Sequence, residues 1–91
     1  MLNLGPDYIK KVYRCIPLET LNILKAKAKG FKGVSVKSVP MPRSLDNFRV
    51  TITANSGISW FRSAELYKSF VGSLDDTTKR TLALLIESTI A

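Results

Sequence analysis

The first apolar residues of the chain recur at intervals of three and four. They are Ile9, Val12, Tyr13 and Ile16. This spacing aligns side chains on one face of an α-helix, so it predicts a helix over residues 8–16. The opposite face of that helix would carry Lys10, Lys11 and Arg14. A short strand is the alternative for this segment, although Lys11 would then share a face with Ile9 and Tyr13.

A second apolar stripe predicts a helix over residues 18–28. Pro17 separates it from the preceding segment, because proline fixes φ and lacks a backbone N–H. The stripe consists of Leu18, Leu21, Leu24 and Ala28. Gly30 follows, and glycine commonly ends a helix.

The period of the pattern changes to two after Gly33. Alternating apolar and polar residues predict strands over 34–39 and 48–53, the first of them ended by Pro40. The Asn-Ser-Gly sequence at 55–57 is typical of a tight turn, so residues 58–61 are predicted to return as a third strand.

The C-terminal third of the chain predicts two helices. The first covers residues 63–70 and ends near Gly72. Ser73 and Asp76 then have the spacing of a capping box, which predicts a helix over 74–90. The full prediction is a single basic α+β domain over residues 1–91 with the order α-α-β-β-β-α-α. Two N-terminal and two C-terminal helices would pack on a small three-stranded antiparallel sheet.

The residue types that are missing exclude several kinds of chemistry. The chain has no His and one Cys, so it can form neither an intramolecular disulfide nor a Cys/His zinc site. Nucleophilic triads built on His are excluded as well, and no Gly-rich phosphate loop is present. We therefore expect a protein that is not an enzyme and that uses no metal or cofactor. Cys15 is interpreted as a small core residue.

Positive charge is concentrated in the N-terminal half. The formal net charge is +7, and residues 1–50 carry all of the excess, since basic and acidic residues balance in 51–91. This asymmetry favours an acidic partner for the N-terminal half. The candidate contacts are Lys10, Lys11, Arg14, Lys25, Lys27, Lys29, Lys32, Lys37 and Arg49.

Two adjacent aromatic residues are a further candidate contact. Trp60 and Phe61 lie in the predicted strand 58–61, where neighbouring side chains point to opposite faces of the sheet. One ring would then be exposed, in a position to stack on a base or to anchor a protein partner.

These patterns predict a non-catalytic nucleic-acid-binding protein. Its basic half would contact the phosphates of DNA or RNA with weak sequence preference. The alternative is a protein-binding inhibitor, adaptor or assembly subunit, of the type that viruses use against host defences. Such a protein would dock its basic face on an acidic protein surface. The residues identify no known family and predict no oligomeric state.

A membrane location is not expected. The longest strongly apolar run covers residues 82–86, against the ~20 residues that a membrane span needs. No apolar segment precedes Lys10, so no signal peptide is predicted. The expected location is the cytoplasm, or the host cytoplasm for a viral protein.

Overall fold

A small antiparallel sheet with helices on one side forms the protein. The structure is a computed structural model that describes residues 7–90, and at positions 44, 45 and 87–90 it describes the backbone alone. The elements, in chain order, are β1 (Tyr8–Pro17), α1 (Leu18–Ala28), β2 (Val34–Met41), β3 (Ser44–Asn55), α2 (Trp60–Gly72), α3 (Asp76–Leu84) and β4 (Ile86–Ile90).

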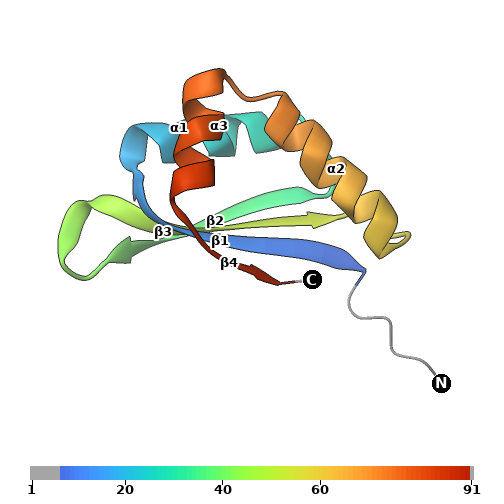
Figure 1. Cartoon of the computed structure of the whole chain (residues 1–91), viewed down its shortest axis with the longest axis horizontal. Helices are drawn as coiled ribbons and strands as arrows, with labels where there is room; N and C mark the ends of the chain where they lie inside the picture. Colours follow the sequence, from blue (N-terminus) through green and yellow to red (C-terminus); the bar gives the residue numbers. More distant parts are fainter. Residues whose placement is uncertain (1–6, 91) are drawn as a thin grey trace.

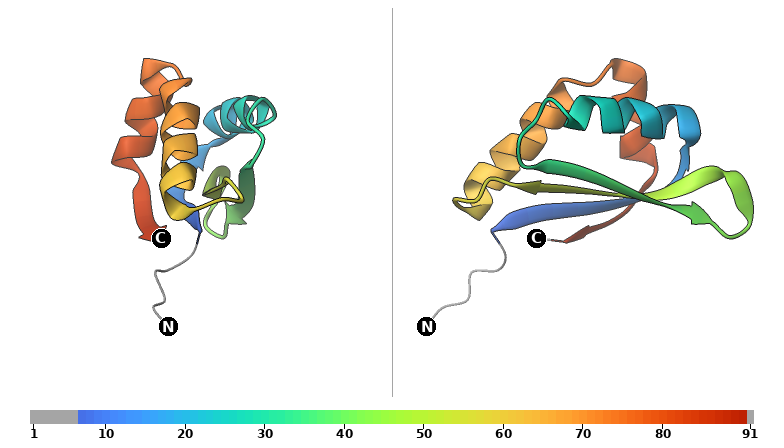
Figure 2. Two further views of the ribbon diagram at one scale, coloured as in Figure 1. Left: turned by 90° about the vertical axis from the view of Figure 1, so that its right-hand side faces the viewer. Right: turned by 180° about the vertical axis from the view of Figure 1, so that it is seen from behind.

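The strands form one sheet in the order β2-β3-β1-β4, and all neighbouring strands are antiparallel. The three helices lie together over one face of this sheet (Figure 1). The views from the side and from behind show no helix across the opposite face (Figure 2). The fold therefore has two layers, and one face of the sheet is open.

The core lies between the sheet and the helical layer. Its largest fully buried side chains include Phe70 from α2, Leu24 from α1 and Ile52 from β3. Along β3 the residues Val50, Ile52 and Ala54 face this core. Since side chains alternate along a strand, the residues between them face the open side.

The order of elements corrects the predicted α-α-β-β-β-α-α fold. Within the described residues there are three helices, and the order is β-α-β-β-α-α followed by β4. The fold is still of mixed α+β type. The helix at 18–28 and the strands at 34–39 and 48–53 occur as predicted, within α1, β2 and β3.

The predicted helix over 8–16 is wrong, because this segment forms β1. Its backbone pairs with β3 on one side and with β4 on the other. The register with β3 shifts between Tyr13 and Ile16, and Cys15 within this bulge has a φ of 58°. The bulge allows Tyr13 and Ile16 both to face the core. Cys15 itself is exposed, which corrects its assignment to the core.

The predicted strand over 58–61 is also wrong. Residues 60 and 61 form the first turn of α2, and Ser59 is its N-cap. The Ser59 hydroxyl accepts a hydrogen bond from the Arg62 backbone N–H at 3.2 Å, which satisfies one of the free donors at the helix start. The hairpin partner of β3 is β2.

The predicted helix over 74–90 is shorter and starts from a different cap. α3 ends at Leu84, and the chain continues as β4 along β1. The N-cap of α3 is Asp75, whose carboxylate accepts hydrogen bonds from the backbone N–H and the hydroxyl of Thr78. Ser73 instead donates its hydroxyl to the Phe70 carbonyl at the end of α2, at 2.6 Å.

We expect Asp75→Ala to lower the urea midpoint of unfolding at neutral pH, because it removes both acceptors for Thr78. The Thr78 hydrogen bonds lower the pKa of Asp75. The contribution of the carboxylate is therefore present at neutral pH and is lost as the pH falls through that lowered value. Asp75→Asn, which keeps a hydrogen-bond acceptor, should retain part of the stabilisation that the carboxylate provides. Equal midpoints for Asp75→Ala and the parent at neutral pH would contradict this cap.

Candidate functional site

The open face of the sheet gathers polar side chains from three strands. The outward positions are Tyr8, Lys10 and Val12 of β1, Ser35, Lys37 and Val39 of β2, and Arg49, Thr51, Thr53 and Asn55 of β3. Most of them line a shallow hollow of about 540 Å³. We call this set the outer sheet face, and none of the helices in the described part of the chain covers it (Figure 2).

The strand register sets which of these side chains are neighbours. Thr53 pairs with Lys10 on one side and with Ser35 on the other. In the next row Thr51 pairs with Val12 and with Lys37. Neighbouring strands lie about 4.8 Å apart, so two lysines flank a central strand of threonines from opposite sides. The arrangement presents two ammonium groups and several hydroxyl groups on one surface.

The outer sheet face is positively charged. Lys10, Lys37 and Arg49 are its ionised residues, and none of the side chains described on this face is acidic. The Lys10 ammonium lies 5.9 Å from the centroid of the Tyr8 ring, within the range of a cation–π contact. Val12 is buried on this side but does not belong to the core cluster, so the face also carries one buried apolar side chain.

The predicted common surface of Lys10, Lys11 and Arg14 is wrong, because the segment is a strand. Lys10 and Lys11 point to opposite faces, and the Lys11 ammonium lies 4.7 Å from the centroid of the Tyr67 ring in the helical layer. Arg14 is exposed beside the bulge, where its backbone N–H donates to the Leu85 carbonyl. Only Lys10 of this trio belongs to the outer sheet face.

The lysines at 25, 27, 29 and 32 lie in α1 and in the segment that follows it, near the β2 edge of the sheet. Lys25 and Lys29 line a small hollow with Val34, Ser35 and Val36 of β2. The other two members of the group, Lys27 and Lys32, are exposed on α1 and in the loop before β2. These lysines add positive charge beside the outer sheet face and do not form part of it.

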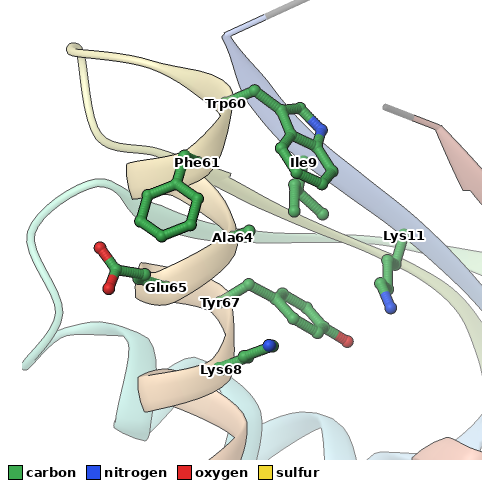
Figure 3. Close-up of a pocket in the computed structure, with 8 residues that line it drawn as sticks. All are labelled: Ile9, Lys11, Trp60, Phe61, Ala64, Glu65, Tyr67 and Lys68. Atoms are coloured by element: carbon green, nitrogen blue, oxygen red, sulfur yellow. The ribbon is translucent and has the colours of Figure 1, made fainter.

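Trp60 and Phe61 do not lie on opposite faces of a sheet, since both belong to α2. Their side chains are 44% and 65% exposed. They line a third hollow, between α2 and β1, together with Ile9, Lys11 and Tyr67 (Figure 3). This hollow is on the helical side of the sheet, away from the outer sheet face.

Several residues of the outer sheet face were not among the candidates predicted from the sequence. They are Tyr8, Ser35, Val39 and Asn55. Alternation along β2 and β3 was a usable signal for all of them except Tyr8. Tyr8 shares parity with Lys10, so only a strand interpretation of 8–16 would have found it.

Two tyrosines meet inside the protein beside Lys11. The hydroxyl groups of Tyr13 and Tyr67 hydrogen-bond to each other. Burial is the main cause that raises the pKa of both phenols. Both groups are therefore neutral donors or acceptors over the physiological pH range.

This pair predicts a loss of stability in alkali. The unfolded chain releases these protons near the ordinary phenol pKa of about 10, while the folded protein holds them. The free energy of unfolding therefore keeps its full value below that pH and decreases as the pH rises above it. The measurement is an alkaline pH titration of a Tyr8→Phe variant, in which Tyr13 and Tyr67 are the only tyrosines left. Phenolate absorbance should rise over the same pH range in which the far-UV ellipticity is lost. Phenolate that forms while the ellipticity is still native would contradict the buried pair.

Among the side chains that the structure describes, no three of His, Cys, Asp or Glu lie close enough together to hold a metal ion. No helix in the described part of the chain is long and apolar enough to cross a membrane. Comparison with protein-family models, with curated proteins and with solved structures finds no match.

Proposed function

We propose that this protein is a non-catalytic, cytoplasmic nucleic-acid-binding protein that binds through the outer sheet face. The observation that carries the proposal is the open sheet on which Lys10 and Lys37 flank Thr51 and Thr53 with no described carboxylate among them. Lysines without a described carboxylate beside them, on an open and hydroxyl-rich surface, suit a polyanionic partner.

The chemistry of the face matches a sugar–phosphate backbone. The two ammonium groups would pair with phosphates, and the hydroxyls of Ser35, Thr51 and Thr53 would donate to phosphate or sugar oxygens. Tyr8 offers a ring on which a base can stack. Contacts of these kinds position a strand without reading base edges, so they support binding with weak sequence preference.

The lysines of α1 would support the same function at longer range. Lys25 and Lys29 adjoin β2, the edge strand that also carries Lys37. Their charges would raise the local concentration of a polyanion and speed its association. The exposed thiol of Cys15 is compatible with a reducing compartment such as the cytoplasm.

The test is a fluorescence anisotropy titration with short labelled oligonucleotides, single-stranded and duplex, of unrelated sequences. We expect binding at low salt to all sequences, with affinities that differ little among them. No binding at low salt would remove the proposal. It would favour the alternative, in which an inhibitor or adaptor docks the same face on an acidic protein surface.

A further inference from the structure

The hollow between α2 and β1 has an apolar end and a charged end. At the apolar end Trp60 and Ala64 project from α2 toward Ile9 of β1, and Phe61 lines the hollow from the side of α2 turned away from β1 (Figure 3). The volume is about 560 Å³, enough for one or two large side chains. Exposed Trp and Phe side chains beside a hollow are the surface from which binding hot spots are commonly built. We call this hollow the α2 groove.

Two ammonium groups lie at the other end of the α2 groove. Lys11 reaches it from β1 and Lys68 from α2, and both lie near the Tyr67 ring (Figure 3). Within the described residues neither has a carboxylate partner. The acidic residue of the lining is Glu65, whose carboxylate is 3.6 Å from the Arg62 guanidinium. The groove thus combines an aromatic wall with two ammonium groups that have no carboxylate partner among the described side chains.

We propose that the α2 groove binds a segment of an acidic partner protein. A bulky apolar side chain of that segment packs against Trp60 and Phe61, and carboxylates next to it pair with Lys11 and Lys68. The apolar end favours a protein side chain over a nucleobase, because Ile9, Trp60, Phe61 and Ala64 present few groups that could pair with the polar edges of a base. The site is independent of the proposed nucleic-acid contact, since it lies on the other side of the sheet. The protein would then be a two-sided adaptor.

The chain contains its own reporter for this site, since Trp60 is the only tryptophan. The probe is an amidated pentapeptide with a central leucine flanked by aspartates. We expect binding of this peptide to change the wavelength and intensity of the Trp60 emission. Its affinity should be about tenfold higher than that of the same peptide with a central alanine. A leucine peptide flanked by lysines should bind more weakly still. Equal responses to the acidic and the basic leucine peptides would overturn the proposal, and so would no response to any of them.

Variants on and off the groove separate a specific site from general attraction. The double variant Lys11→Gln with Lys68→Gln should bind the acidic leucine peptide about 3–10-fold more weakly, because two exposed charge pairs are lost. The matched control, Lys27→Gln with Arg80→Gln, removes the same charge elsewhere and should leave the affinity unchanged. Phe61→Ala should weaken binding by a similar factor, whereas Leu84→Ala, at another exposed apolar residue, should not. A short oligonucleotide that displaces the peptide and gives the same Trp60 response would assign the groove to nucleic acid and refute the proposal.

Discussion

Replacing Phe70 with alanine is expected to lower the free energy of unfolding by about 3–5 kcal/mol, the usual cost of removing a buried aromatic side chain. Phe70 is fully buried and is the largest of the fully buried side chains. Its ring packs edge-to-face against Phe31, with centroids 5.6 Å apart. This contact joins α2 to the segment between α1 and β2. A domain of this size has roughly 5–14 kcal/mol in total, so the variant would be close to unfolding.

Urea denaturation followed by far-UV circular dichroism measures this effect. The matched control is Phe61→Ala, which removes the same ring from a side chain that is 65% exposed. A surface substitution of this kind is expected to change stability by less than about 0.5 kcal/mol. Similar losses of stability for the two variants would mean that α2 does not pack Phe70 into the core.

The second large effect concerns nucleic-acid affinity. Reversing both lysines of the outer sheet face, Lys10→Glu with Lys37→Glu, is expected to weaken binding on the order of 1,000-fold at low salt. Each reversal replaces an attraction of about 1 kcal/mol at contact distance with a repulsion of similar size. The two side chains lie on either side of Thr51 and Thr53, so a bound strand cannot avoid them.

The control for this variant keeps the overall charge the same. Lys68→Glu with Arg80→Glu makes the same change on exposed residues of α2 and α3, in the helical layer. It should weaken binding only through the long-range field, by a much smaller factor that salt readily screens. Anisotropy titrations of both variants against one oligonucleotide distinguish the loss of contacts on the outer sheet face from the change in net charge. Equal losses would show that net charge alone governs binding.

The failure of the prediction for residues 8–16 has a local physical cause. β1 is paired on both sides, and Val12 is buried on the outer face while Ile9 and Tyr13 face the core. The bulge at Cys15 then returns Ile16 to the core side. Burial on two faces together with a change of register produces the spacing of a helix. Periodicity alone cannot distinguish these cases.

The predicted helix over 74–90 was too long for a reason that lies far away in the sequence. Residues 76–84 carry a genuine helix signal, and nothing local to 86–90 requires a strand. β4 forms because its backbone pairs with β1, more than seventy positions earlier in the chain. Similarly, the outward direction of Lys37 and Arg49 could be read from alternation within their own strands. Their proximity to Lys10 depended on the register between strands, which one sequence does not specify.

The dependence of affinity on salt tests the role of the outer sheet face most directly. The logarithm of the binding constant should fall linearly with the logarithm of salt concentration, with a slope of about −0.7 to −0.9 for each phosphate contact. Lys10→Ala with Lys37→Ala should flatten this slope by about two contacts, and Lys68→Ala with Arg80→Ala should leave it unchanged. Identical slopes for the two variants, or no binding by the parent at low salt, would contradict the account.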